Sequence, residues 1–351
     1  MIKYDKVRAL LEKQQLDALL IMSDYNRRYL SGFTGSSGAV IITKNNQYLI
    51  SDFRYKSQAK EQAEHFDFVL QTKGLLPFVI EFLQDKNIKT IGFEGQHVNF
   101  NTYKDLKSHF ELVPLTGEVE KIRMIKTSDE LTLIQKACEI ADESFEYILK
   151  YIQPGMTELE VKNELENYMT KLGASGPSFD TIVASGYRGA LPHGVASDKV
   201  IETGDMVTLD FGAYYQGYAS DITRSFGVGS LSDEMTKIYN IVLESQLKAL
   251  DEIKSGMSGS EADKISRDVI KSYGYGDNFG HSLGHGFGLE VHESPGLAQK
   301  SEFILEEGMC FTVEPGIYVD NVGGVRIEDD CIVTENGLKK LTHSSKDLFI
   351  I

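Results

Sequence analysis

The sequence has few cysteines and no long apolar run, and both shortages limit the classes of protein to which it can belong. Its cysteines are three, far apart and without a CxxC pair: Cys138, Cys310 and Cys331. Such a sparse, odd number is typical of reduced, buried thiols, so we expect a cytoplasmic protein. The longest early apolar run, Ala18–Met22, is too short to cross a bilayer. The charged segment Met1–Gln15 predicts an amphipathic helix and not a signal peptide, and we expect no membrane partner.

Positive charge is also scarce, because 36 Lys and Arg residues stand against 52 Asp and Glu, for a formal net charge of −16. A phosphate backbone is bound by clustered basic residues that displace counterions, and the sequence contains no such cluster. We therefore expect no nucleic-acid partner. The remaining composition, 41% hydrophobic and 25% charged, is ordinary for a globular enzyme. At 351 residues the chain is long for a single core, which favours two domains.

The first third of the chain alternates short apolar runs with amphipathic stretches, a pattern typical of an α/β domain. The predicted strands are Ala18–Met22, Ala39–Thr43, Tyr48–Ser51 and Thr90–Phe93, and the predicted helices are Tyr55–Glu64, Leu76–Asp85 and Thr102–His109. Charged residues then crowd into Glu118–Thr127, after which Thr127 and Glu130 form a capping box that opens a long helix through Tyr151. We therefore predict two domains, residues 1–122 and 123–351.

The second predicted domain contains an internal duplication. Pro154-Gly155-Met156 before one helix corresponds to Ser255-Gly256-Met257 before another, and Thr208–Tyr214 matches Thr312–Tyr318 position by position. Each copy reads as a helix, a loop and a β-hairpin that carries a carboxylate. The first hairpin is predicted to pair two strands, Met206–Phe211 and Tyr218–Phe226. Two such halves are expected to pack about a pseudo-twofold axis and to bring their carboxylates together.

Four acidic residues on these two hairpins predict a metal site. They are Asp210 and Asp221 on the first hairpin, and Glu314 and Glu328 on the second. Four carboxylates in an apolar setting repel one another and are costly to desolvate, and two divalent cations would neutralise them. The segment Gly280–Gly288, rich in Gly and His, is expected to supply an imidazole. Oxygen ligands with one imidazole suit Mn²⁺, Co²⁺, Fe²⁺ or Zn²⁺, and the residues do not choose among these metals.

At these residues the sequence resembles the pita-bread metallopeptidases, which include aminopeptidase P, Xaa-Pro dipeptidase and methionine aminopeptidase. The matching stretches are TLDFG at 208–212, SDITR at 220–224, GHGFGLEVHE at 284–293, TVEPGIY at 312–318 and RIED at 326–329. The resemblance implies five ligands for two metals: Asp210, Asp221, His285, Glu314 and Glu328. The N-terminal region resembles a creatinase-type domain. The fold class implied is therefore α+β, with an N-terminal α/β creatinase-like domain followed by a pita-bread catalytic domain that holds the internal pseudo-twofold repeat.

The resemblance also implies a function, namely a dinuclear-metal exopeptidase that hydrolyses the Xaa-Pro bond. Its substrates would be peptides with proline in second position or Xaa-Pro dipeptides. A hydroxide that bridges two metals would attack the peptide bond, and Mn²⁺ is the metal that we expect. The implied catalytic residues are His193, His281, His292, Glu314 and Arg326. Glu314 is expected to shuttle protons, His193 and His292 to contact the scissile peptide, and His281 to line the substrate pocket. Arg326 is expected to orient the carboxylates of Asp221 and Glu328 or to bind the substrate. The resemblance further implies a homodimer or a larger homo-oligomer.

Two alternatives to an Xaa-Pro peptidase stay open at this point. A methionine aminopeptidase-like enzyme fits less well, because those enzymes generally lack the N-terminal domain. A catalytically inactive pita-bread domain that serves as a binding module is also conceivable, but such proteins typically lose ligands, and all five are present here. Creatinase shares both domains but lacks the metal ligands, and because all five are present in this sequence we do not expect it to hydrolyse creatine. Within the peptidases, the sequence does not decide between a dipeptidase and an enzyme that accepts longer peptides.

Overall fold

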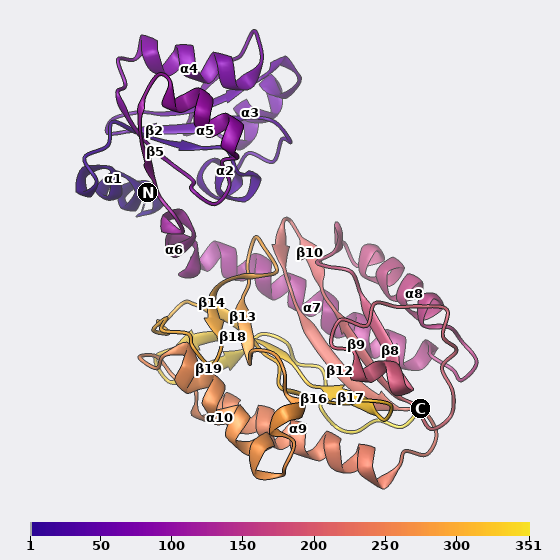
Figure 1. Cartoon of the computed structure of the whole chain (residues 1–351). Coiled ribbons are helices and arrows are strands. Elements are labelled where there is room, and N and C mark those ends of the chain that lie inside the picture. Colours follow the sequence, from indigo (N-terminus) through magenta and orange to yellow (C-terminus); the bar gives the residue numbers. More distant parts are fainter. Residues whose placement is uncertain (1) are drawn as a thin grey trace. The chain divides into compact units, whose positions relative to one another are not determined.

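The computed structural model describes residues 2–351, so Met1 of the predicted N-terminal helix lies outside the described residues. The chain forms two compact units, one ending at Arg123 and the other comprising Met124–Ile351. The helices and strands of both are labelled in Figure 1. Among the described residues no helix is both long enough and apolar enough to cross a membrane. The three cysteines are free and buried, as the sequence predicts.

The first unit is built on one mixed sheet with the strand order β4-β3-β2-β1-β5-β6. The strands are β1 Ala18–Ile21, β2 Ala39–Thr43, β3 Gln47–Ser51, β4 Asp67–Leu70, β5 Thr90–Phe93 and β6 Glu111–Pro114. The helices are α1 Ile2–Lys13, α2 Asp24–Ser31, the short 3₁₀ helix η1 Phe53–Tyr55, α3 Lys56–Gln62, α4 Leu75–Asp85, α5 Phe100–Lys107 and α6 Glu118–Met124, which reaches the second unit. The predicted α/β architecture of this region is confirmed.

Besides η1 and α6, three elements of the first unit are missing from the sequence prediction, each for a physical reason. The strands β4 and β6 lie at the two edges of the sheet, are partly exposed and are only four residues long, so their apolar runs are too short to mark them as strands. Helix α2 has no apolar stripe, because its buried side chains include Asn26 and Arg27. Arg27 donates to the backbone oxygens of Gly35 and Gly38, so hydrogen bonds hold this helix where hydrophobic packing normally would.

Two helices of the second unit begin at the predicted capping boxes. Helix α7, Ser128–Tyr151, starts where the Glu130 amide donates to the Thr127 hydroxyl and the Thr127 amide donates to the Glu130 carboxylate. The same reciprocal pair opens α8 at Thr157 and Glu160. Helix α8 comprises Glu158–Lys171. The other helical elements are η2 Gly186–Ala190, α9 Asp233–Glu252, α10 Gly259–Ser272 and η3 Gly276–Asn278. The long predicted helix is thus confirmed at both ends.

The internal duplication is visible in the backbone. Matching amides donate to matching carbonyls in the two halves: Gly155 to Ile201 and Gly256 to Leu305, Glu158 to Lys199 and Gly259 to Phe303. The central strands also correspond, since β8, β9 and β12 are adjacent in one sheet and β13, β15 and β18 are adjacent in the other. These strands are β8 Ile182–Ser185, β9 Met206–Phe211, β12 Ile222–Gly227, β13 Gly284–Gly286, β15 Cys310–Val313 and β18 Asp329–Thr334. The predicted repeat is confirmed by this shared hydrogen-bond pattern.

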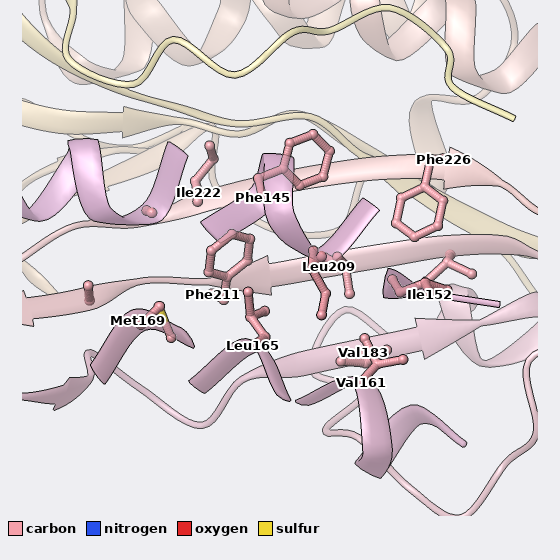
Figure 2. Packing of buried hydrophobic residues seen from close by; sticks show 14 of the residues in the cluster. Phe145, Ile152, Val161, Leu165, Met169, Val183, Leu209, Phe211, Ile222 and Phe226 are labelled. Carbon is pink, nitrogen blue, oxygen red and sulfur yellow. The ribbon is translucent and has the colours of Figure 1, made fainter. Parts of the chain in front are cut away.

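Shorter strands flank these central ones. They are β7 Gly176–Pro177, β10 Ala213–Tyr215, β11 Tyr218–Ala219, β14 Glu293–Leu297, β16 Gly316–Val319, β17 Gly323–Arg326 and β19 Gly337–Lys340. The core of the first half lies between helices α7 and α8 and the strands β8, β9 and β12. Figure 2 shows Phe145 of α7 and Leu165 of α8 among side chains from those strands, including Leu209 and Phe226. This packing fixes β9 and β12, which carry or border two of the predicted ligands.

The predicted strand Tyr218–Phe226 is wrong in one respect, because the chain leaves the ladder at Ser220-Asp221 and divides into β11 and β12. The Asp221 amide donates to the carboxylate of Asp330, at 2.8 Å, where a strand residue would donate to a neighbouring carbonyl. The Ser220 hydroxyl accepts from the Ala213 amide. The break frees Asp221 from the sheet, and its carboxylate reaches the cavity described below.

Candidate metal centre

The four predicted acids lie at equivalent places in the two halves of the repeat. Asp221 immediately precedes β12, as Glu328 immediately precedes β18. Asp210 belongs to β9, while Glu314 directly follows the equivalent strand, β15. The two halves are joined here, because the Glu328 amide donates to the Thr223 carbonyl at 3.1 Å. The duplication therefore concentrates four carboxylates at the meeting of the two sheets.

One cavity of about 300 Å³ gathers all the residues that the sequence predicts for the site. They are His193, Asp210, Asp221, His281, His285, His292, Glu314, Arg326 and Glu328. The rest of its lining consists of Phe179, Ile182, Pro192 and Ser282. The apolar lining residues Phe179, Ile182 and Pro192 were not predicted, because nothing in the sequence distinguishes them from residues of the hydrophobic core. They give the cavity a hydrophobic wall beside its charged one.

Asp221, His285 and Glu328 form a cluster in the cavity that could hold a metal ion. Each offers one potential ligand atom, and the three atoms all lie within 4.8 Å of one another. Asp221 Oδ1 is buried and has no hydrogen-bond partner among the described residues. A buried carboxylate oxygen without a partner is costly, and a cation at the centre of the cluster would relieve that cost.

The tautomer of His285 also fits a metal ligand. Its Nδ1 lies 3.2 Å from the carbonyl oxygen of Gly286, and because a carbonyl only accepts, Nδ1 carries the hydrogen. Nε2 then presents a lone pair, 3.6 Å from Asp221 Oδ2 and 3.3 Å from Glu314 Oε1. A lone pair that faces two carboxylates is repulsive unless a cation or a carboxyl proton lies between them. An N–H bonded to a backbone carbonyl is the usual support of a metal-binding histidine.

The electrostatics of the cluster point to the same donor set. Burial, reinforced by the nearby carboxylate of Glu328, raises the pKa of Asp221 well above its ordinary range. Burial likewise raises the pKa of Glu328 well above its usual value, and it raises the pKa of Glu314 to about 8 against the opposing charge of Arg326. Without cations the cluster therefore retains protons at neutral pH. Divalent cations favour the ionised carboxylates, so their binding is expected to release these protons.

Arg326 pairs with Asp210, a partner that the sequence did not suggest; the expectation that it orients Asp221 and Glu328 or binds the substrate stays a prediction. Its Nη2 donates to Asp210 Oδ2. Its Nε donates to the Thr223 hydroxyl at 3.1 Å, which in turn donates to Glu328 Oε2 at 2.5 Å. The Thr223 side chain thus stands between the guanidinium and Glu328. Arg326 is buried, with 4% of its side chain exposed, and its charge balances the cluster from within.

His281 is held in one tautomer by a chain of hydrogen bonds. Its Nδ1 donates to the Ser282 carbonyl at 2.8 Å, so Nε2 accepts from the Tyr318 hydroxyl at 2.7 Å. The Tyr318 oxygen accepts from Arg326 Nη1 at 2.8 Å. Burial lowers the pKa of His281 to about 4, which leaves the ring neutral at neutral pH. His281 lines the cavity as the sequence predicts, with both ring nitrogens already engaged.

His292 lies beside His285, with ring centroids 4.2 Å apart. Burial, together with the neighbouring His285, lowers the pKa of His292. The next residue, Glu293, accepts from Lys126 in an ion pair whose two side chains are almost completely buried. This pair fixes the backbone on one side of His292.

Comparisons with known proteins place this geometry in a family. The model of metallopeptidase family M24 matches residues 132–335, and the model of the creatinase/prolidase N-terminal domain matches residues 3–125. The chain belongs to metallopeptidase family M24. The M24 match contains the five predicted ligands, and the family is metal-dependent by its description. The predicted fold class, a creatinase-type domain followed by a pita-bread catalytic domain, is confirmed.

Relatives of this M24 metallopeptidase match along almost the whole chain. An uncharacterized peptidase of Bacillus subtilis (strain 168) is 50% identical over 100% of both chains. The Xaa-Pro dipeptidase of Pyrococcus furiosus is 42% identical over 99% of each. Among solved structures, the Xaa-Pro dipeptidase from Bacillus anthracis is 50% identical with a TM-score of 0.98, over 100% of this chain and 99% of that one. The X-Pro aminopeptidase from Thermotoga maritima is 41% identical with a TM-score of 0.91, over 96% and 98%.

Proposed function

We propose that this M24 metallopeptidase hydrolyses the bond before proline in Xaa-Pro dipeptides, with two Mn²⁺ ions held by Asp210, Asp221, His285, Glu314 and Glu328. The observation that carries the proposal is the single cavity in which these five side chains face an apolar wall. Four carboxylates and one imidazole form an oxygen-rich donor set, which suits Mn²⁺. A cytoplasmic location and a homodimer or larger homo-oligomer stay predictions.

The size and lining of the cavity support a small substrate that contains proline. Its volume of about 300 Å³ is at the lower end of the roughly 300–1,000 Å³ typical of ligand pockets. Phe179, Ile182 and Pro192 form its apolar side, which suits a proline ring that has no N–H to satisfy. Two of the relatives above are named Xaa-Pro dipeptidases. The match at residues 3–125 covers the domain that methionine aminopeptidases generally lack.

The residues around the donor set have distinct roles in the proposed reaction. Bound divalent cations supply Lewis acidity and lower the pKa of water at the site. The chain itself must orient the peptide and return a proton to the proline nitrogen when the bond breaks. His193 and His292, which line the cavity, are placed to donate to the substrate carbonyl groups. Glu314, whose carboxylate also accepts from the Thr312 hydroxyl at 3.0 Å, is the proposed proton carrier.

A comparison of two peptides tests this proposal. We expect the full chain, freed of metal and then supplied with Mn²⁺, to release alanine from Ala-Pro at least about 10-fold faster than from Ala-Pro-Ala. Ala-Ala serves as the control for the requirement for proline, and Co²⁺ and Zn²⁺ replace Mn²⁺ in parallel samples. Preferred cleavage of the tripeptide would point to an aminopeptidase. Metal binding without cleavage of any of these peptides would point to an inactive binding module.

A further inference from the structure

The loop that carries His193 is closed at its base by one buried carboxylate. Glu158, the first residue of α8, has a fully buried side chain. Its Oε1 accepts from the amide and hydroxyl of Ser185 at 2.8 and 2.9 Å, and its Oε2 accepts from the amide and hydroxyl of Ser197 at 3.0 and 2.7 Å. Both ends of the segment 185–197 are therefore bound to a single side chain.

Arg188 extends this connection into the loop itself. Its Nη1 donates to Glu158 Oε2, and its Nη2 donates to the carbonyl of Val195 at 2.9 Å. On the other side of His193, the carbonyl of Pro192 accepts from Arg326 Nη1 at 3.2 Å. The backbone on both sides of His193 is thus tied to a guanidinium group. We propose that Glu158 and Arg188 are positioning residues for His193, an inference that rests on the function proposed above.

Hydrophobic packing does not account for the order of this loop. Its large apolar side chains face solvent, with Tyr187 60% exposed, Leu191 52% and Val195 43%. Within the loop, the Gly194 amide donates to the Leu191 carbonyl at 3.0 Å, and the Val195 amide donates to the His193 carbonyl at 2.9 Å. Such short turns at a surface are easily opened by water, so the ion pair with its hydrogen bonds, and a β-bridge between Val195 and Ile182, hold the loop.

The second half of the internal repeat forms the same backbone hydrogen bond without a carboxylate. Glu158 and Gly259 occupy the same position in the two halves, and their amides make the same backbone hydrogen bond, to Lys199 and to Phe303. The second half keeps this backbone arrangement with a residue that has no side chain. Burying a carboxylate is costly, and the first half buries the carboxylate of Glu158 at the base of the loop that carries His193, a candidate catalytic residue. This asymmetry favours a role at the active site over a role in folding.

Arg188→Ala in the Mn²⁺-loaded full chain tests the proposal. We expect kcat for Ala-Pro to fall about 10- to 100-fold, the usual cost of losing a residue that orients a catalytic group. KM and the metal content are expected to change little. Lys162→Ala is the matched control, because Lys162 is also a partly buried cation in an ion pair, but its partner is Glu166 within α8 and not a residue of the loop. A fall in kcat no larger than that of the control would overturn the proposal.

Combination with His193→Ala separates positioning from general stability. If Arg188 acts through His193, then Arg188→Ala lowers kcat by less than about twofold when His193 is already alanine. An undiminished loss in that background would contradict the proposal, as would a His193→Ala variant with wild-type kcat. Glu158→Gln, which removes the charge, is expected to follow Arg188→Ala and serves if the first variant does not fold.

Hydrogen exchange provides a readout that does not depend on the reaction. We expect Arg188→Ala to speed exchange of the Gly194 and Val195 amides while exchange in α8 stays unchanged. Unaltered exchange of these two amides would overturn the positioning role even if kcat fell. A wild-type chain that cleaves no Xaa-Pro peptide would refute the proposed function, whereas the exchange result would still decide whether Glu158 and Arg188 hold the loop.

Discussion

Replacing Asp221 by asparagine is expected to abolish peptide hydrolysis and, at the same time, to stabilise the metal-free protein at neutral pH. Turnover should fall by more than the roughly 100-fold that loss of a residue outside the ligand set can cost. The substitution keeps the shape of the side chain and removes its charge. In the metal-free protein the Asp221 carboxyl group is buried beside Glu328, so folding must either bury its charge or protonate it, and Oδ1 lacks a hydrogen-bond partner among the described residues.

The gain in stability should depend on pH in a defined direction. Burial raises the pKa of Asp221 well above its ordinary value of 3.8. A carboxyl group whose pKa is raised by folding takes up a proton on folding, so the metal-free wild type loses stability as pH rises above 3.8. Asparagine does not ionise and avoids that loss. The Tm of chelator-treated Asp221→Asn should therefore exceed that of the wild type at pH 7, and the part of the difference due to this ionisation should disappear near pH 3.8.

Calorimetry across this pH range, with metal content and Ala-Pro turnover measured on the same samples, checks both halves of the prediction. Asp251→Asn is the control, since Asp251 is an exposed residue of α9 and its charge is solvated. Wild-type turnover and metal content in Asp221→Asn would show that Asp221 is not a ligand. A lower Tm of the metal-free variant at pH 7 would contradict the electrostatic explanation.

Arg326→Met is expected to destabilise the metal-free protein by about 3–5 kcal/mol, because it removes one partner of a buried ion pair and leaves Asp210 uncompensated. The same change deprives Tyr318 and the Pro192 carbonyl of their donor, so we expect turnover to fall as well. Mn²⁺ should recover part of the lost stability, since a cation replaces the positive charge near Asp210. Methionine approximates the volume of the arginine side chain without its charge.

Urea denaturation with and without Mn²⁺ measures this effect. Arg54→Met is the control, because Arg54 forms its ion pair with Asp52 at the surface, with 59% of its side chain exposed. Exposed ion pairs contribute little, so the midpoint of that variant should stay close to wild type. An equal, small change in both variants would show that Asp210 is not held as a buried charge, and no recovery with Mn²⁺ would argue against a cation beside it.

The parts of the fold that the sequence predicts are those that local signals specify. The capping box of Thr127 and Glu130 predicts the start of α7, and the repeated turns and hairpins predict that Asp210 corresponds to Glu314. The strand break at Asp221 was not predictable in the same way. It depends on a hydrogen bond from its amide to Asp330, more than a hundred residues away in the sequence.

The candidate site shows the same division between local and distant information. All predicted site residues reach one cavity, because the duplication and its turn residues bring them there. The pairing of Arg326 with Asp210 was not predicted, since the sequence suggested Asp221 and Glu328, or the substrate, and the pairing depends on the packing of β17 against β9. The pairing of Glu158 with Arg188 could not be predicted at all, because a Glu at the start of a helix usually needs no explanation beyond the helix dipole.

The central claim is that hydrolysis depends on two divalent cations held by five side chains. Its most direct test is a titration of Mn²⁺ into the metal-free full chain, with bound Mn²⁺ per chain and Ala-Pro hydrolysis measured on the same samples. The proposal predicts no turnover without bound Mn²⁺ and a maximum when two ions are bound per chain. Full turnover in the metal-free protein, or a maximum reached before a second ion binds, would contradict it.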